Sequence, residues 1–412
     1  MLVDLIYTLI DTLNQVSSCL DECCLTVHVY ACLGGFWKKL MRHMLNPYFG
    51  QGLPSETGLA EGEISTDVDS AKALFKLCPA AHITPLTNHA DLATSLNIGG
   101  LVFKDERSRM GLGSFKSLGA AYAIAKSADK CVRDGKADSH DTALRGVTYV
   151  CASAGNHGLS MAAGAALFGA RAVVYLSDTV PEAFADRLRA KGAEVVRAGH
   201  NYEASMAAAV DAAAANDWNL LSDSTWPGYS DPARDVMEGY LIMGMEVVAQ
   251  MPESPTHIFL QAGVGGLAAA SAAAARTSWG ADPVICIVEP DAAPALMGSI
   301  AAGKATASGG PVSNMGRLDC KEPSHLALKY LAREANAFMV VSDAEALAAV
   351  ATLKENGVAS TPSGVAGFAG LQIACTENID IGLDKNSRVL IYISEGPEDE
   401  GSDDEGPEVA RG

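Results

Sequence analysis

Short apolar runs alternate with alanine-rich stretches along most of the chain. A short run of apolar residues predicts a strand that is buried on both faces. Such runs occupy the ranges 101–104, 147–152, 172–176, 193–197, 257–261, 284–289 and 388–393. Alanine-rich stretches predict helices, and they occupy the ranges 119–128, 156–168, 181–191, 202–216, 267–275 and 344–356.

This alternation predicts the fold class. Strands that alternate with helices, and are apolar on both faces, are typical of parallel sheets covered by helices on both sides. We therefore expect an α/β protein with parallel sheets. Ligands in such folds bind beyond the carboxyl ends of the strands. The residues after Cys151, Leu260 and Ile393 are thus where chemistry is expected.

The N-terminal segment departs from this pattern. Its apolar residues recur at helical spacing and predict an amphipathic helix: Leu2, Leu5, Ile6, Leu9 and Leu13. Asp4 and Asp11 interrupt the segment, so it lacks the ~18–20 apolar residues that a stable membrane span needs. No early basic region precedes an apolar stretch with a small-residue cleavage site, so we do not expect a secretory signal. An interface helix, an interfacial membrane helix and an upstream translation artefact remain open.

Composition and charge narrow the partners. The length of 412 residues suits two or three domains. With 30 basic and 49 acidic residues, a net charge of −19 argues against nucleic acid and anionic membranes as partners. Part of the acidic excess lies in residues 395–408, a solvated tail. The ten cysteines are scattered without paired CxxC motifs, which predicts no metal site and a reduced, cytoplasmic protein.

The first candidate for chemistry is a lysine in a small-residue context. Lys116 follows Phe115 in the stretch 111–120, which is rich in glycine and serine. Burial among apolar and small groups disfavours the charged form of a lysine, so we expect a lowered pKa for Lys116. A lowered pKa is what a Schiff-base lysine requires. A surface lysine beside a helix start is the alternative.

The second candidate is the loop after the strand that ends at Ala152. It reads Ser153, Ala154, Gly155, Asn156, His157 and Gly158. Ser153 is expected to cap the following helix, and the helix N-terminus offers N–H groups to an anion such as a substrate carboxylate. Asn156 offers a donor for a phenolic oxygen. An ordinary capping turn is the alternative, and a structural role for His157.

Two further loops follow strands. Gly263, Val264, Gly265, Gly266 and Leu267 form a glycine-rich turn before a helix, which suits a phosphate. The turn lacks the spacing of a dinucleotide site and the G-K-[ST] of a P-loop, so we expect it to hold a single phosphate. Ser394 follows the last strand and could meet a ring nitrogen, although alone it indicates little.

In this order the four loops resemble fold type II pyridoxal-phosphate enzymes, the family of tryptophan synthase β and threonine dehydratase. The resemblance covers roughly residues 71–400 and implies two parallel-sheet domains around pyridoxal 5'-phosphate. It implies that Lys116, beside Phe115, binds the cofactor covalently and that Asn156 contacts the 3-oxygen. It also implies that residues 263–267 bind the phosphate and that Ser394 faces the pyridine nitrogen.

One branch of the family resembles the chain further. The stretch from Lys104 to Lys116 is similar to the KDES-x-R-x-GL-x-x-FK signature of diaminopropionate ammonia-lyases, and the segment from Asp223 to Tyr229 to their D-T-x-W-x-G-Y. That family usually reads Asp-Gly-Asn-His-Gly, where this chain has Ala154. The family assigns the missing Asp to D-substrates, and Asp223 matches the acid associated with L-substrates. The resemblance therefore implies α,β-elimination of 2,3-diaminopropionate to pyruvate and ammonia, with a preference for the L-enantiomer.

Alternatives remain open. The Ala154 departure favours an L-serine or L-threonine dehydratase, and a non-catalytic protein on the same scaffold is a third reading. The resemblance also points to a homodimer that acts on a small amino acid. It divides the chain into these parts: an N-terminal extension over 1–45, an arm and the start of the large domain over 46–100, the smaller domain with the lysine segment within 101–250, the large domain with the phosphate loop over 251–400, and an acidic tail over 401–412.

Overall fold

The structure, a computed structural model, describes residues 42–54 and 58–397. The chain divides into two units, Met1–Met44 and Leu45–Gly412. The expected N-terminal helix and the acidic tail lie outside the described residues. Strand β1, His43–Leu45, spans the boundary between the units. All other described elements belong to the second unit, which holds two sheets.

The larger sheet in the second unit has the strand order β10-β9-β8-β11-β3-β2. Its strands are β2 (Leu86–Asn88), β3 (Gly100–Asp105), β8 (His257–Gln261), β9 (Val284–Pro290), β10 (Ala337–Val341) and β11 (Arg388–Ile393). Neighbours are parallel, except that β2 is antiparallel to β3. The expected parallel pairing therefore holds for these strands except at the β2 edge. Residues 89–99 join β2 to β3, and a parallel crossover needs about a dozen residues or more.

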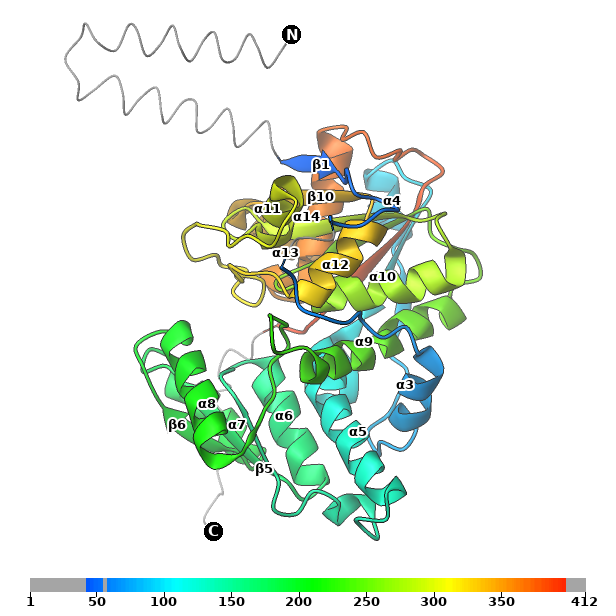
Figure 1. Ribbon diagram of the computed structural model, residues 1–412. Coiled ribbons are helices and arrows are strands. Elements are labelled where there is room, and N and C mark those ends of the chain that lie inside the picture. The colour runs from blue at the N-terminus through cyan, green and yellow to red at the C-terminus, as the bar shows by residue number, and fades with distance from the viewer. Residues whose placement is uncertain (1–41, 55–57, 398–412) are drawn as a thin grey trace, which may run out of the picture. The chain divides into compact units, whose positions relative to one another are not determined.

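The smaller sheet is wholly parallel, with the order β6-β5-β4-β7. Its strands are β4 (Thr148–Cys151), β5 (Arg171–Leu176), β6 (Glu194–Arg197) and β7 (Asn219–Leu220). The helices around it are α6 (Asn156–Leu167), α7 (Glu182–Ala190) and α8 (Tyr202–Asn216). In Figure 1 these helices form the lower part of the second unit, below the larger sheet. Each sheet thus has its own helical cover.

The larger sheet carries most of the remaining helices. They are α10 (Gly266–Trp279), α11 (Ala295–Ala302), α12 (His325–Glu334), α13 (Asp343–Glu355) and α14 (Pro362–Thr376). Helices α3 (Val68–Phe75), α4 (Ala90–Ser95), α5 (Ala120–Arg133) and α9 (Asp231–Gln250) complete the α-helices of the described residues. The short 3₁₀ helices are η2 (Glu106–Gly111), η3 (Phe115–Leu118) and η4 (His140–Thr142).

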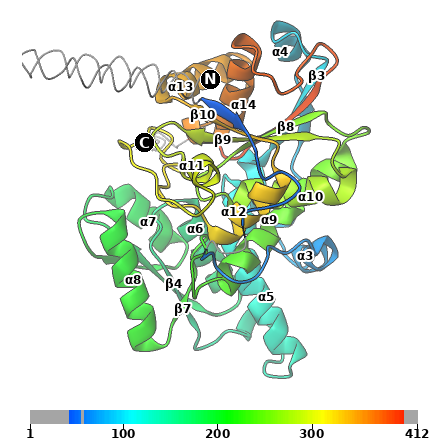
Figure 2. The same cartoon turned by 45° about the horizontal axis from the view of Figure 1, so that its top comes forward.

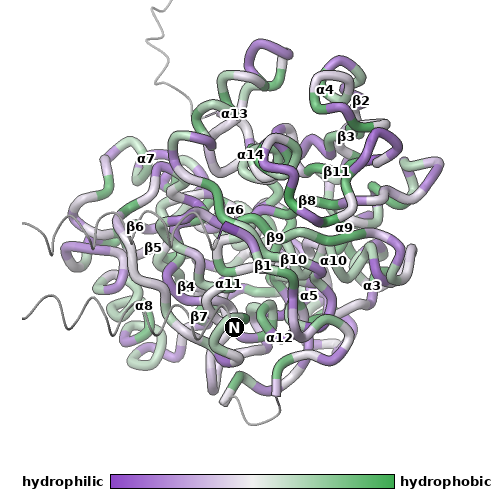
Figure 3. Tube along the Cα trace, turned by 90° about the horizontal axis from the view of Figure 1, so that it is seen from above, coloured by the Kyte–Doolittle hydropathy of each residue, from purple (hydrophilic) through white to green (hydrophobic). Residues whose placement is uncertain are grey.

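The main core lies between the larger sheet and helices α13 and α14. Side chains of β3, β8, β9, β10 and β11 that face these helices, such as Phe103 and Phe259, are buried together with Phe368 of α14. In Figure 3 the tube is coloured hydrophobic along β8, β9 and β10. Burial of apolar surface on this scale is the main stabilising contribution to such a sheet.

The candidate loops lie close together at one edge of the larger sheet. Helix α9 packs along α10 (Figure 2). It also contacts η3 and α5. Strands β8 and β11 are neighbours, so the loops that follow them lie at the same edge of the sheet. The Phe115 N–H donates to the Ser394 carbonyl over 3.0 Å, which ties the lysine segment to the end of β11. The fold therefore places three of the four candidate loops side by side.

Candidate active site

Lys116 lies in η3 and contacts a carboxylate from the other sheet. Its Nζ donates a hydrogen bond to Oδ2 of Asp223, and the two side chains are 21% and 20% exposed. Asp223 follows β7 in sequence, so the pair joins two segments that are distant along the chain. The structure thus brings together the two residues that the sequence predicts to be catalytic.

The ion pair changes the pKa of Lys116 in the direction opposite to the one expected from burial. Burial alone would lower the pKa of Lys116, but the Asp223 carboxylate outweighs burial and raises that pKa above the ordinary lysine value. Burial likewise acts to raise the pKa of Asp223, yet Lys116 holds it well below its usual range. The expectation of a lowered lysine pKa is wrong, because an opposite charge in contact stabilises the charged form.

The segment after Asp223 is held rigidly. The Trp226 and Tyr229 backbones exchange two hydrogen bonds of 3.0 and 2.9 Å, and their rings stack with centroids 4.3 Å apart. The Tyr229 hydroxyl donates to the Leu220 carbonyl over 3.0 Å and accepts from the Ser222 N–H over 2.9 Å. These contacts fix the chain on the N-terminal side of Asp223 and so fix its carboxylate.

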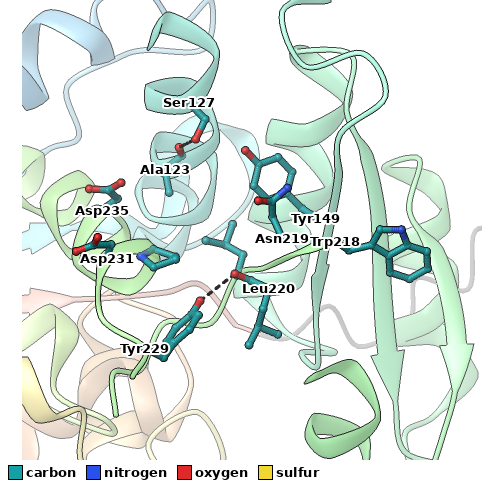
Figure 4. Close-up of a pocket in the computed structure, with 11 residues that line it drawn as sticks. Ala123, Ser127, Tyr149, Trp218, Asn219, Leu220, Tyr229, Asp231 and Asp235 are labelled. Atoms are coloured by element: carbon teal, nitrogen blue, oxygen red, sulfur yellow. Dashed lines mark hydrogen bonds between the residues drawn. The ribbon is translucent and has the colours of Figure 1, made fainter. Parts of the chain in front are cut away.

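A cavity lies behind this segment. Figure 4 shows Tyr229 turned toward Leu220, and the cavity is lined also by Tyr149, Trp218 and Asp235. Neither Lys116 nor Asp223 lines it. The cavity is therefore distinct from the lysine–aspartate pair.

The asparagine loop begins α6 without a side-chain cap. The helix starts at Asn156, its N-cap is Gly155, and no side chain accepts the first amide hydrogens. The expectation that Ser153 caps this helix is therefore wrong. Because the first amides of a helix lack intrahelical partners, they remain available to an anion. A Cβ on Gly158 would lie 2.1 Å from the Ser153 carbonyl oxygen, so the tight turn requires glycine there.

His157 has a structural contact. Its side chain is 5% exposed, and its Nε2 lies 2.8 Å from the Leu221 carbonyl, which can only accept, so Nε2 carries the proton. Burial lowers the pKa of His157, which keeps the ring neutral at neutral pH. The Nδ1 atom is then an acceptor, which does not attract a carboxylate. The backbone N–H of His157 is the group that suits a substrate carboxylate.

Asn156 contacts the Glu395 carboxylate, which the sequence places at the start of a solvated acidic tail. That expectation is wrong for Glu395, because the fold buries it. The Asn156 Nδ2 donates to Oε2 of Glu395 over 2.8 Å. Glu395 is 3% exposed, also pairs with Arg317 over 3.0 Å, and accepts a hydrogen bond from the Thr361 hydroxyl. Because a carboxylate only accepts, it fixes the amide orientation of Asn156 and leaves the second Nδ2 hydrogen for another acceptor. The Ser394-Glu395-Gly396 run is the signal from which Glu395 could have been found.

The glycine turn between β8 and α10 can hold an anion. Gly265 has φ +101°, a left-handed conformation, and a Cβ there would lie 3.1 Å from Ala327 and 3.2 Å from Leu296. A Cβ on Gly263 would lie 3.1 Å from Sγ of Cys320. Helix α10 has no side-chain N-cap, so its first amides face the turn without a protein cap. Only glycines allow this close packing, and the open helix N-terminus suits a phosphate.

One buried hydroxyl faces this region without a partner. The Tyr240 side chain is 1% exposed, and its hydroxyl makes no hydrogen bond within the described residues. Its ring lies 4.9 Å from that of Phe115, and Cε2 would lie 3.5 Å from a Cβ on Gly266. A buried orphan donor is costly. Together with the open turn and Lys116, it fits a site that holds pyridoxal phosphate.

Ser394 is placed at the junction of these groups. It is 4% exposed, its N–H donates to the Gly364 carbonyl over 3.3 Å, and its carbonyl accepts from Phe115. Its backbone is therefore fixed between η3 and α14. Among residues 42–54 and 58–397 no helix is long and apolar enough to cross a membrane, and no group of three potential metal ligands occurs.

Comparisons with known proteins bear on this arrangement. The model of the family "Pyridoxal-phosphate dependent enzyme" matches residues 77–395. The diaminopropionate ammonia-lyase of Escherichia coli K12 is 30% identical over 338 residues, which cover 77% of this chain and 85% of that protein. That of Salmonella typhimurium is 34% identical over 230 residues, which cover 53% of this chain and 56% of that protein.

A solved structure gives the same result. The crystal structure of the Escherichia coli diaminopropionate ammonia-lyase with an aminoacrylate–pyridoxal-phosphate intermediate is 27% identical, with a TM-score of 0.74. The match covers 86% of this chain and 93% of that chain. The expected fold class is confirmed.

Proposed function

Because the chain belongs to the pyridoxal-phosphate dependent enzyme family, we propose that it is an ammonia-lyase that converts 2,3-diaminopropionate to pyruvate and ammonia. The contact between Lys116 and Asp223, beside the open glycine turn, carries this proposal. It unites a lysine that can bind the cofactor with a carboxylate that can move a proton. The similarity to two diaminopropionate ammonia-lyases supports the substrate.

Each side of the site has a proposed task. The turn of residues 263–267 binds the cofactor phosphate, and Lys116, packed beside Phe115, binds the cofactor covalently. Asn156 donates to the 3-oxygen, held by Glu395, and Ser394 faces the ring nitrogen. When bound, pyridoxal phosphate stabilises negative charge at the substrate Cα.

The substrate is held by backbone groups. The loop of Ser153, Ala154, Gly155 and the N–H of His157 begins α6, and its free amides suit the substrate carboxylate. A charged side chain is not required for this task, because the helix dipole adds to the amide donors. The substrate amine then faces Lys116.

Asp223 is the proposed base. While Lys116 is an ammonium, it keeps the Asp223 carboxylate charged and of low basicity. Where the Lys116 nitrogen carries no charge, burial would dominate and raise the pKa of Asp223. The carboxylate can then take the Cα proton, and a proton returned to the leaving amine completes the elimination.

The stereochemistry follows from the asparagine loop. Asp223 offers a carboxylate to one face of Cα, whereas Ala154 cannot accept a proton at the place where the family has a second acid. We propose a preference for L-diaminopropionate of at least ~10²-fold over the D-enantiomer, the low end for a positioned acid–base group. Replacing Ala154 by aspartate (Ala154→Asp) should recover part of the D-reaction.

One alternative substrate has a specific observation in its favour. The run from Ala154 to Gly158 resembles threonine dehydratases, so L-serine or L-threonine could replace diaminopropionate. The test is a pyruvate or 2-oxobutyrate release assay across diaminopropionate, serine and threonine, each in both enantiomers. Fastest release from L-diaminopropionate supports the proposal, and fastest release from a hydroxy amino acid rejects it. A chain without the absorbance band of lysine-bound cofactor would be non-catalytic.

We also propose a cytoplasmic homodimer with the domain division given above. The scattered free cysteines of the described residues support a reducing compartment. Sedimentation should give twice the chain mass of 42.7 kDa. A single species at the chain mass would contradict the dimer.

A further inference from the structure

Tyr240 stands out among the buried polar groups of the second unit. It lies in α9, is 1% exposed, and its hydroxyl has no hydrogen-bond partner within the described residues. A buried donor without a partner loses its hydrogen bonds to water and gains none in return. Such a group in a folded protein calls for a partner that the chain itself does not supply.

Two glycines make room for this ring. A Cβ on Gly119 would lie 2.6 Å from Cε1 and 2.7 Å from the hydroxyl oxygen of Tyr240, so a side chain there would clash. On the other side, a Cβ on Gly266 would lie 3.5 Å from Cε2. The ring therefore lies between the start of α5, close to Lys116 in sequence, and the first residue of α10.

The hydroxyl keeps a hydrogen that it can donate. Burial raises the pKa of Tyr240 above its ordinary value, and the nearby Lys116 only partly opposes this effect. The phenol therefore keeps its proton at neutral pH. An acceptor can take this hydrogen, and the open amides of α10 beside Gly266 mark the place for an anion.

We propose that the Tyr240 hydroxyl donates a hydrogen bond to the phosphate of the cofactor, alongside the amides of residues 263–267. This inference rests on the proposed function, because it needs pyridoxal phosphate in the site. It adds a side-chain ligand to a phosphate site that the sequence identifies by backbone groups alone. Tyr240 is a binding residue in this account and takes no part in proton transfer.

The test compares two ligands that differ by the phosphate. Equilibrium dissociation constants of pyridoxal phosphate and of pyridoxal are measured with the full-length apo-protein, for the wild type and for Tyr240→Phe. We expect pyridoxal phosphate to bind about 10-fold or more weakly to the variant, as for a lost hydrogen bond to a charged group. Pyridoxal affinity should change less than about twofold, because pyridoxal has no phosphate to lose.

Tyr122→Phe is the matched control. Tyr122 is 7% exposed and its hydroxyl donates to Glu238 over 2.5 Å, within the same α5–α9 interface. The control should lower the melting temperature of the apo-protein and leave both affinities unchanged. Apo Tyr240→Phe should melt no lower than the wild type, because it removes a hydroxyl that had no partner.

Three outcomes would overturn the inference. One is an unchanged affinity for pyridoxal phosphate, and another is an equal loss for both ligands. The third is a lowered kcat at unchanged cofactor affinity, which would place the hydroxyl on the substrate. A wild-type chain that binds neither ligand would instead overturn the proposed function, and this inference with it.

Discussion

Two clusters of ion-paired side chains arise from one short stretch of sequence, residues 104–116, and they differ in how completely their surroundings are hydrogen-bonded. The first half of the stretch supplies Lys104 and Arg109, which pair with Glu246 of α9, and Glu106, which pairs with Arg109. The second half supplies Lys116, which meets Asp223. Both clusters pair acids with bases, yet only the second is surrounded by unsatisfied hydrogen-bonding groups.

The first cluster is saturated. Arg109 is fully buried and uses both terminal nitrogens and Nε, with bonds of 2.7–2.9 Å to Glu106, Glu246, Thr84 and the His82 carbonyl. Lys104 donates to Glu246 over 2.6 Å, to the Thr84 carbonyl over 2.8 Å and to Gln250 over 2.9 Å. Two positive and two negative side chains balance, so the cluster needs no ligand.

The second cluster is incomplete. The Tyr240 hydroxyl and Nδ1 of His157 have no hydrogen-bond partner within the described residues. The amides that begin α6 and α10 have no side-chain cap. Burial of charge alone therefore does not mark a functional site, whereas unsatisfied groups around an ion pair do.

The largest effect on activity is expected at Lys116. Replacing it by alanine (Lys116→Ala) should lower the elimination rate by about 10⁴-fold or more, the upper end for a positioned acid–base group. The folded protein should persist, because burial then raises the pKa of Asp223 and the acid becomes neutral. Borohydride reduction and peptide mapping of the wild type should find the pyridoxyl group on Lys116. A label on another lysine would contradict the site.

The opposite result is expected at Glu246. Its replacement by alanine (Glu246→Ala) leaves Lys104 and Arg109 without a buried counter-charge, and breaking such a pair costs about 3–5 kcal/mol of unfolding free energy. Denaturant unfolding measures this loss. The control is Asp186→Ala, which removes an exposed partner of Arg189 and should cost less than about 1 kcal/mol. An equal loss of unfolding free energy in both variants would show that the cluster of Lys104, Glu106, Arg109 and Glu246 does not stabilise the fold.

The same cluster sets a pH dependence. Arg109 and Lys104 outweigh the burial of Glu246 and hold its pKa below the ordinary value. A carboxyl whose pKa is lowered by folding contributes stability above its unfolded pKa and loses it as pH falls through the folded pKa. The wild type should therefore lose more stability than Glu246→Ala between about pH 5 and pH 3. If the stability of the two proteins changes with pH in the same way, Glu246 is not the titrating group.

A smaller effect is expected at Glu395. Replacing it by alanine (Glu395→Ala) removes the acceptor that orients Asn156, so we expect cofactor affinity to fall by about 10-fold, as for one hydrogen bond. The variant Glu395→Gln keeps a carbonyl acceptor, so its cofactor affinity should fall less. The absorbance of bound cofactor against pH is the second readout, because Asn156 is proposed to contact the 3-oxygen. Unchanged spectra and affinity in both variants would leave Glu395 with a structural role alone.

Much of the fold was predictable because local and tertiary preferences agree. The ranges of α8, β8 and β11 match the predicted 202–216, 257–261 and 388–393. Helix α8 is rich in alanine, and the Asn201 side chain caps it by accepting from the Ala204 N–H over 2.9 Å. Here propensity, capping and burial give one answer.

Helices α9 and α14 were not predictable in the same way. Glycines interrupt their hydrophobic pattern, and a glycine inside a helix lowers its intrinsic propensity. The structure shows why they are there: a Cβ on Gly239 would lie 2.0 Å from the Leu118 carbonyl oxygen, and one on Gly367 would lie 3.0 Å from the Phe259 carbonyl oxygen. These helices are stabilised by close packing against the backbone of neighbouring elements. The hydrophobic periodicity of the sequence does not reveal such packing.

The candidate site was also predictable from the sequence only in part. The four loops and their order were readable from spacing and family resemblance. The raised pKa of Lys116 was not, because Asp223 lies 107 positions away and meets it only through the fold. Tyr240 was missed because it belongs to α9, one of the helices that the pattern does not identify. Ser153 fails as a cap because the helix begins two residues beyond Ala154.

The central claim is that the Lys116–Asp223 pair performs elimination on the L-enantiomer. The most direct measurement is the rate of pyruvate release from L- and D-diaminopropionate by the wild type and by Asp223→Asn, with bound cofactor quantified by absorbance. We predict a wild-type rate at least ~10²-fold higher for L than for D, and a similar loss of the L-rate in Asp223→Asn at full cofactor occupancy. Equal wild-type rates for both enantiomers, or an undiminished L-rate in Asp223→Asn, would contradict the account.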